Sequence, residues 1–188
     1  SMLELALDGG EIAVRSYWSI PARASGEELV PATGYEARFR ELLEDSVRLR
    51  LMADVGCGVF LSGGLDSAVV AALAAKSLSL PTFSVLSRST IESGDAAASR
   101  EVAGALGLPN HQVCFDLDDK VFTPDDWRRV LWACELPNAT AEQLYKYHLH
   151  AFARQRYPDL KVMLLGQGSD EFLGGYMDMF LPRRDVWR

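Results

Sequence analysis

The segment that most constrains the fold of this chain is residues 58–67, GVFLSGGLDS, where an apolar run ends in a glycine-rich turn before an alanine-rich stretch. The pattern predicts a buried strand, a tight turn and a helix that begins near Asp66. Small residues at positions 62–64 let backbone N–H groups approach an anion, and a helix start adds the positive end of its dipole. The segment therefore favours a bound phosphate. The simpler alternative is a glycine turn between core elements that binds nothing.

The spacing excludes two common phosphate-binding patterns. A Walker loop would end in Gly-Lys-Ser/Thr, and the dinucleotide fingerprint would need a third glycine where this chain has Ser67. The pattern that remains, Ser-Gly-Gly-x-Asp-Ser, resembles the loop of enzymes that cleave ATP between its α and β phosphates.

A second glycine motif occupies residues 162–176, VMLLGQGSDEFLGGY, where another apolar run opens into glycines and carboxylates. Together the two motifs resemble the synthetase domain of asparagine synthetases and their relatives, the β-lactam and carbapenam synthetases. The resemblance covers most of residues 36–176. Other pyrophosphate-loop enzymes, such as GMP synthetase, NAD synthetase and tRNA-thiolating enzymes, share the first motif but lack the second, so the second motif carries the family assignment.

Strand and helix signals alternate along the middle of the chain and predict an α/β fold with a mostly parallel sheet flanked by helices on both faces. The resemblance implies an adenine nucleotide alpha hydrolase-like (HUP-type) three-layer sandwich. Ligands of such sheets bind at the carboxyl ends of the strands, so both glycine motifs are expected to line one crevice. The predicted strands are residues 58–61, 82–87, 112–115 and 161–165, and the predicted helices are 66–76, 96–106, 125–134 and 141–157.

The resemblance implies that ATP and Mg²⁺ bind to the two motifs. Asp66 and Asp170 match the family's magnesium ligands, and the main chain of Leu61, Val85 and Gly166 matches its adenine site. Simpler interpretations are a helix cap for Asp66, a solvated loop carboxylate for Asp170, and core packing for Leu61 and Val85. The expected nucleotide-binding residues are Leu61, Ser62, Gly63, Gly64, Asp66, Ser67, Val85 and Gly166.

The family activity implied is that of an ATP-dependent carbon–nitrogen ligase, in which a carboxylate is adenylated and an amine or ammonia then displaces AMP. Asp66, Gln167 and Glu171 are the expected catalytic residues. Position 167 is usually glutamate in asparagine synthetases and tyrosine in β-lactam synthetases. Because a carboxamide cannot act as a general base, proton removal would fall to another group, Glu171 or Glu135.

The sequence leaves the identity of the acceptor substrate open. Gln143 stands where asparagine synthetases carry an arginine that handles aspartate, and an amide cannot make the bidentate pair that arginine makes with a carboxylate. One alternative is therefore a synthetase that closes a lactam or macrocycle within one substrate. Another is a remnant that binds ATP without turning it over.

The resemblance also predicts the organisation of the chain. Residues 1–35 are expected to be a linker remnant that follows an absent glutaminase domain, and residues 36–188 the N-terminal portion of an ATP-binding synthetase domain, apparently truncated. The expected partners are a small-molecule carboxylate, a glutaminase domain or subunit as ammonia source, and a second copy in a homodimer.

Charge and hydropathy argue against two other classes of partner. A net charge of −7 without a basic stripe disfavours nucleic acid. The longest apolar run, residues 68–75, is far shorter than the roughly 18 residues that suggest a membrane span. We therefore expect a cytoplasmic protein with no nucleic-acid or membrane partner.

Overall fold

The computed structural model of the protein describes residues 1–6, 10, 12–19, 34–115, 122–173 and 175. The chain forms two compact units, Ser1–Ala37 and Arg38–Arg188. The first unit contains an antiparallel hairpin of β1 (Met2–Leu5) and β2 (Ile12–Arg15). The division falls two residues beyond the linker boundary expected at residue 35.

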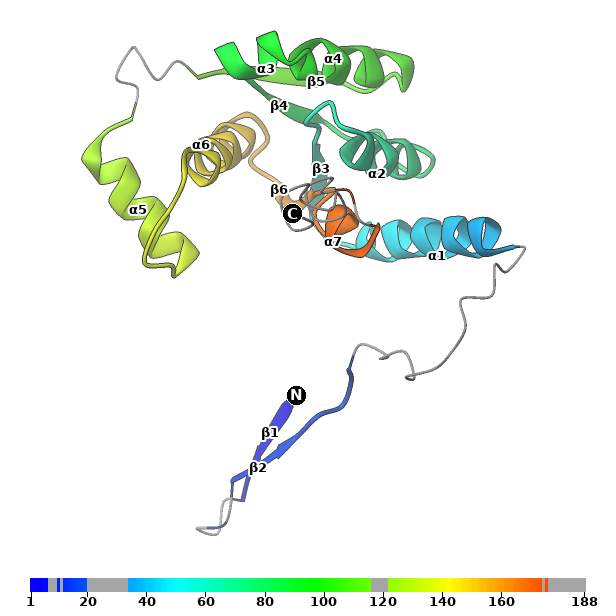
Figure 1. Ribbon diagram of the computed structural model, residues 1–188, viewed down its shortest axis with the longest axis vertical. Coiled ribbons are helices and arrows are strands. Elements are labelled where there is room, and N and C mark those ends of the chain that lie inside the picture. The colour runs from blue at the N-terminus through cyan, green and yellow to red at the C-terminus, as the bar shows by residue number, and fades with distance from the viewer. Residues whose placement is uncertain (7–9, 11, 20–33, 116–121, 174, 176–188) are drawn as a thin grey trace, which may run out of the picture. The chain divides into compact units, whose positions relative to one another are not determined.

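The second unit is built around a four-stranded sheet in the order β5-β4-β3-β6, and every neighbouring pair of strands is parallel. Its strands are β3 (Gly56–Phe60), β4 (Thr82–Leu86), β5 (Asn110–Cys114) and β6 (Leu160–Leu164). Its helices are most of α1 (Tyr35–Arg50), which begins within the first unit, and α2 (Leu65–Ala75), α3 (Arg88–Glu92), α4 (Asp95–Ala105), α5 (Pro124–Cys134), α6 (Ala141–Arg156) and α7 (Ser169–Leu173). The predicted α/β fold with a parallel sheet flanked by helices is confirmed (Figure 1).

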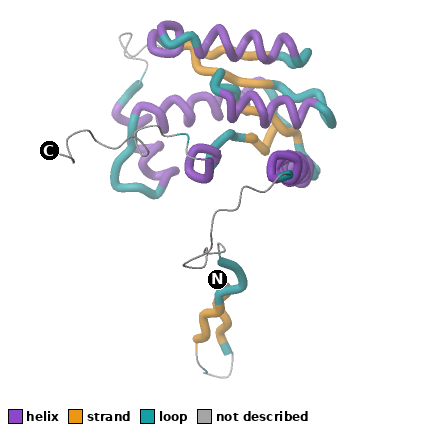
Figure 2. The backbone as a smooth tube through the Cα atoms, turned by 45° about the vertical axis from the view of Figure 1, so that its right-hand side comes forward, coloured by secondary structure: helices purple, strands orange, loops and turns teal. Residues whose placement is uncertain are grey.

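Helices cover both faces of the sheet. Alternate side chains of each strand point to opposite faces, so each strand packs against helices on both sides. Cys57, Val59 and Leu61 pack with residues of α1, α2 and α4 on one face. Phe60 and Phe83 pack with residues of α6 on the other face. Figure 1 shows α1 and α2 on one side of the strands and α6 on the other, and Figure 2 shows the same layering from a second angle. Burial on both faces explains why β3, β4 and β6 read as largely apolar runs in the sequence, whereas β5, at the edge of the sheet, is more polar.

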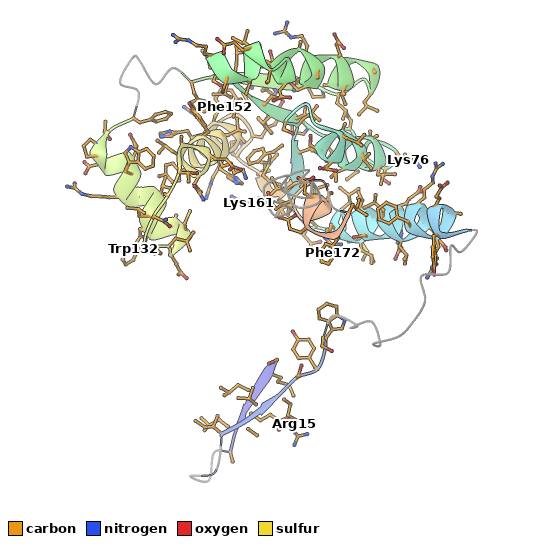
Figure 3. The ribbon with its side chains drawn as sticks, in the orientation of Figure 1. Arg15, Lys76, Trp132, Phe152, Lys161 and Phe172 are labelled. Carbon is orange, nitrogen blue, oxygen red and sulfur yellow. The ribbon has the colours of Figure 1, made fainter. Side chains whose placement is uncertain are left out.

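An aromatic cluster fills the α6 face. Phe83 is fully buried and its ring lies 5.4 Å from that of His111, 6.3 Å from Phe152 and 5.9 Å from Tyr157. Phe152 comes from α6, so this cluster joins the helix to the sheet (Figure 3). Aromatic pairs at such centroid separations each add about 0.5–1.5 kcal/mol beyond the area that they bury.

Two short helices were not predicted from the sequence. α3 starts at a capping box in which the Ser87 side chain accepts from the Thr90 backbone N–H and the Thr90 hydroxyl accepts from the Ser87 N–H. The sequence pattern that signals a capping box has Glu or Gln in place of Thr90, so this start was missed. α7 follows the glycines at 166 and 168, which read as a loop. None of the helices in the described ranges is long and apolar enough to cross a bilayer.

Candidate functional site

A cavity of about 560 Å³ lies at the carboxyl ends of β3, β4 and β6. Its volume falls within the roughly 300–1,000 Å³ of small-molecule sites. The chain runs from β3 outward through β4 to β5 and then returns to place β6 on the other side of β3. Open α/β sheets bind ligands at such a switch in strand order. The predicted site residues that line this cavity are Leu61, Ser62, Asp66, Ser67, Val85, Gly166, Gln167, Asp170 and Glu171.

The first glycine motif forms a loop that is held by its own serines. The Ser62 backbone N–H donates to Ser67 Oγ at 3.1 Å, and the two serine hydroxyls lie 2.9 Å apart. Ser67 Oγ also donates to the Gly64 carbonyl, 3.1 Å away. These bonds close the loop between the end of β3 and the first turn of α2 without any ligand.

Gly63 allows this loop to pack against the start of α4. Its φ angle is +100°, a region that side chains disfavour. A Cβ atom at Gly63 would lie 2.3 Å from the Asp95 carbonyl oxygen. Gly63 and Gly64, both predicted site residues, thus shape the loop without lining the cavity.

The second glycine motif touches the first directly. A Cβ atom at Gly166 would lie 2.8 Å from the Ser67 backbone nitrogen and 2.9 Å from Asp66 Cβ. The main chain after β6 therefore runs against the first turn of α2. Position 166 needs a glycine for this close approach.

Two carboxylates stand in the first turn of α7, Asp170 and Glu171, and both line the cavity. Asp66 stands in the first turn of α2 and lines it too. The N-cap of α2 is Gly64, so the interpretation of Asp66 as the helix cap is wrong. Asp170 is half-buried in a helix, which also overturns its interpretation as a solvated loop carboxylate.

The main-chain groups expected to bind adenine are partly engaged within the sheet. The Leu61 N–H donates to the Phe83 carbonyl at 2.9 Å, and the Leu61 carbonyl accepts from Ser84 Oγ at 2.7 Å. The Val85 carbonyl accepts from the Thr90 hydroxyl at 3.0 Å. A carbonyl oxygen has two lone pairs, so both carbonyls can accept a further bond, whereas the Leu61 N–H is committed.

One wall of the cavity comes from α6, which holds Gln143, the residue that the resemblance placed in a substrate site, but the residues of α6 that line the cavity were not named from the sequence. Glu142, Tyr145, Lys146 and Leu149 line it, at the i, i+3, i+4, i+7 spacing of a single helix face. That spacing was readable in the sequence. A Glu and a Lys four residues apart are typical of a solvent-facing pair, however, so the signal pointed away from a site.

The asparagine synthase family model matches residues 38–188. The chain belongs to the asparagine synthase family. It is 47% identical over 185 residues to asparagine synthetase (glutamine-hydrolyzing) 2 of Bacillus subtilis (strain 168), an alignment that covers 96% of this chain and 25% of that protein. It is 34% identical over 162 residues to the asparagine synthetase (glutamine-hydrolyzing) of Zea mays, covering 80% of this chain and 27% of the relative.

The chain thus spans about a quarter of the length of these asparagine synthetase relatives. Among solved structures, the NH3-dependent NAD synthetase of Campylobacter jejuni subsp. jejuni is similar with a TM-score of 0.42 and 18% sequence identity, over 74% of this chain and 60% of that one.

Two residues that we weighed for asparagine synthase chemistry have structural roles. Gln143 Oε1 accepts from the Thr140 backbone N–H at 2.6 Å and from the Thr140 hydroxyl, so it belongs to the capping box of α6. Glu135 is the C-cap of α5, with a φ angle of 53°. Neither lines the cavity, whereas Glu171 does. Gly174 and Tyr176 of the second motif lie outside the described residues.

Proposed function

We propose that this chain carries the ATP site of an ATP-dependent amide-forming ligase, which adenylates a carboxylate and passes the acyl group to an amine or ammonia. The observation that carries the proposal is the contact between the two glycine motifs, Gly166 against Asp66 and Ser67, at the edge of one cavity. Membership of the asparagine synthase family supports the same class of reaction.

The phosphates of ATP would lie against the first loop. The N-terminus of α2 opens there, and its first-turn N–H groups and positive dipole end favour an anion. Because hydrogen bonds between Ser62 and Ser67 already hold the loop closed, little backbone ordering is left for the ligand to impose.

The charge of the cavity fits a divalent cation. Among the described residues, five carboxylates and one lysine line the cavity, which gives a formal excess of four negative charges. This excess would repel a triphosphate that carries no cation. Mg²⁺ is commonly bound by one or two carboxylates together with phosphate oxygens. Asp66 and Asp170, one from each motif, would hold it. When bound, Mg²⁺ neutralises negative charge on the phosphate oxygens.

The reaction then needs few groups from this chain. A carboxylate oxygen of the substrate attacks the α phosphorus, and the bond to the β-phosphate oxygen breaks to release pyrophosphate. The amine then attacks the acyl carbon, AMP leaves, and a proton leaves the nitrogen. We assign acceptance of that proton to Glu171, which lines the cavity, because the carboxamide of Gln167 cannot act as a base.

Calorimetric titration of Mg-ATP tests the proposal directly. We expect the wild-type chain to bind, and Asp66→Ala and Asp170→Ala each to weaken binding by at least about tenfold, the loss typical of a hydrogen bond or ligand to a charged group. Asp125→Ala is the matched control, since Asp125 also stands in the first turn of an eleven-residue helix but lies outside the cavity. A folded wild-type chain that binds no Mg-ATP would refute the proposal for this chain.

Gln167 supports a second candidate reaction, the closure of an amide within one substrate, because it lines the cavity at a position where asparagine synthetases usually have a glutamate. ATP–pyrophosphate exchange that is stimulated only by a carboxylate other than aspartate would favour this reaction, whereas exchange stimulated by aspartate would favour amide formation with ammonia. Nucleotide binding without AMP release for any carboxylate would instead mark the chain as a binding module.

A further inference from the structure

The two aspartates that we expect to hold Mg²⁺ each pack against a glycine of the second motif. A Cβ atom at Gly166 would lie 2.9 Å from Cβ of Asp66, and a Cβ atom at Gly175 would lie 1.8 Å from Oδ1 of Asp170. Both separations are shorter than the roughly 3.5 Å of van der Waals contact. The contacts differ in kind, because main-chain atoms of α2 also oppose Gly166, whereas the atom closest to Gly175 belongs to a carboxylate.

The turn that ends α7 brings Gly175 back against Asp170. The Gly175 N–H donates to the Asp170 carbonyl at 3.2 Å, so the bond spans five residues. Bonds of this kind close the C-termini of many helices. Because α7 spans only Ser169–Leu173, the bond reaches back to a residue in its first turn. The backbone therefore fixes position 175 beside the Asp170 side chain.

The Asp170 carboxylate occupies the space that a side chain at position 175 would need. A Cβ atom there would lie 1.8 Å from Oδ1, 2.8 Å from Cγ and 3.3 Å from Cα of Asp170. The two closest atoms can turn away by rotation of the aspartate side chain, so a methyl group at position 175 would redirect the carboxylate. Among the described residues, no hydrogen bond or ion pair holds this carboxylate, so packing sets its orientation.

We propose that Gly175 is a positioning residue for the divalent cation. Because Gly175 has no side chain, the Asp170 carboxylate can take the orientation in which it lines the cavity. Mg²⁺ demands near-ideal octahedral geometry with oxygens at about 2.0–2.1 Å, so a carboxylate in another rotamer would not serve it equally well. This inference rests on the proposed Mg-ATP site and adds to it a residue that acts through Asp170.

Calorimetric titration of Gly175→Ala with and without the cation tests this role. Each protein is titrated with ATP in excess Mg²⁺ and again in a chelator, and the ratio of the two dissociation constants measures how strongly Mg²⁺ supports binding. The comparison variants are Asp170→Ala and the double variant Asp170→Ala/Gly175→Ala. Gly104→Ala is the control, because a Cβ atom at Gly104, within α4, would meet no heavy atom within 4 Å beyond its own helix backbone.

We expect Gly175→Ala to reduce the ratio by at least about tenfold, the loss typical of a ligand to a charged group, and to leave the affinity for metal-free ATP within about twofold of wild type. In the Asp170→Ala background the same substitution should change the ratio by less than about twofold, because the carboxylate through which Gly175 acts has been removed. A glycine with only a structural role would affect binding equally with and without Mg²⁺, and in both backgrounds.

Urea unfolding of the same proteins keeps the test decisive if Gly175→Ala is unstable. Removing the Asp170 side chain makes room for the new methyl group, so Gly175→Ala should lower the urea midpoint of wild type more than that of Asp170→Ala. Equal losses in the two backgrounds would overturn the inference, as would a folded Gly175→Ala that keeps the wild-type ratio.

Failure of the proposed function gives a different result. A wild-type chain that binds no Mg-ATP, or that binds ATP equally well with and without Mg²⁺, would refute the Mg-ATP site and with it the role of Gly175. Wild-type binding that depends on Mg²⁺, together with an unchanged Gly175→Ala, would overturn only the positioning role.

Discussion

Replacing Gly166 by alanine tests the contact between the two glycine motifs. The new methyl group would lie 2.8 Å from the Ser67 nitrogen and 2.9 Å from both the carbonyl carbon and Cβ of Asp66. Carbon atoms in van der Waals contact are about 3.5 Å or more apart, so the methyl group would be about 0.6 Å too close to two carbon atoms. Two of the three opposing atoms are main chain, in the first turn of a helix, and cannot rotate away as a side-chain end would.

The cost of this overlap follows from how the loops can respond. Gly166 does not have a positive φ angle, so alanine adds no backbone strain of its own. The loop after β6 must move away from α2 by several tenths of an ångström, and overpacking of this kind costs about 1–3 kcal/mol. The same displacement separates the residues expected to hold Mg-ATP. We expect a loss of nucleotide affinity larger than the loss of stability alone would cause.

Urea unfolding and Mg-ATP titration of the same samples measure the two effects. Gly104→Ala is the matched control, because Gly104 lies within α4, has no heavy atom within 4 Å of its Cβ position and has an ordinary φ angle. That variant should gain up to about 1 kcal/mol, since alanine favours a helix interior over glycine. If Gly166→Ala unfolds at the wild-type urea concentration and binds Mg-ATP with wild-type affinity, the two loops do not pack against each other as described.

Three further variants test the elements around the site. Thr123→Ala removes the hydroxyl that accepts from the Asp126 N–H at 3.2 Å at the start of α5, and should lower the free energy of unfolding, measured by urea titration, by about 1 kcal/mol. A loss of stability no larger than that from a surface substitution would contradict the cap. Ser84→Ala removes a buried hydroxyl that donates to the Leu61 carbonyl, and should lower the free energy of unfolding by about 1 kcal/mol. Weaker Mg-ATP binding by this variant would show that the hydroxyl also supports the cavity. Unchanged stability would contradict the hydrogen bond. Burial, and secondarily the Arg156 guanidinium, lower the pKa of His111 below 6.5. The unfolded chain then takes up the proton more readily than the folded chain, so stability should fall as the pH drops below about 6.5. His111→Gln should flatten this dependence of stability on pH, and a slope equal to that of the wild type would refute the role of His111.

The sequence predicted the elements that carry the site because each has a strong local signal. The strand, turn and helix of residues 58–67 lie within two residues of the positions expected from the apolar run and the glycines. The same holds for β6, expected at residues 161–165 and found at Leu160–Leu164. A parallel sheet with two covered faces follows from such runs, since each strand must be apolar on both sides.

What the sequence could not predict depends on contacts between distant residues. Nothing near Gly63 indicates that the Asp95 carbonyl lies against it. Nothing local distinguishes Lys146 and Glu142 from an ordinary surface pair, because only the cavity beside α6 makes them site residues. Gln143 was interpreted by alignment as part of a substrate site, whereas the cap of α6 uses its side chain. Local patterns locate elements, and packing decides which of their faces meets a ligand.

The core and the site are coupled through the register of β6 on β3. Cys57 lies opposite Val162 and Val59 opposite Leu164, which carries the chain straight into Gly166 beside Ser67. A slip of one residue would exchange the two faces of β6 and bring Gln167, with a full side chain, to the place where only glycine fits. On the α6 face, Gly58 leaves no room for a Cβ, which would lie 2.9 Å from Leu160 Cδ1. The packing that sets the register of the strand therefore also sets the distance between the two loops, and a substitution deep in the sheet can weaken ligand binding without touching the cavity.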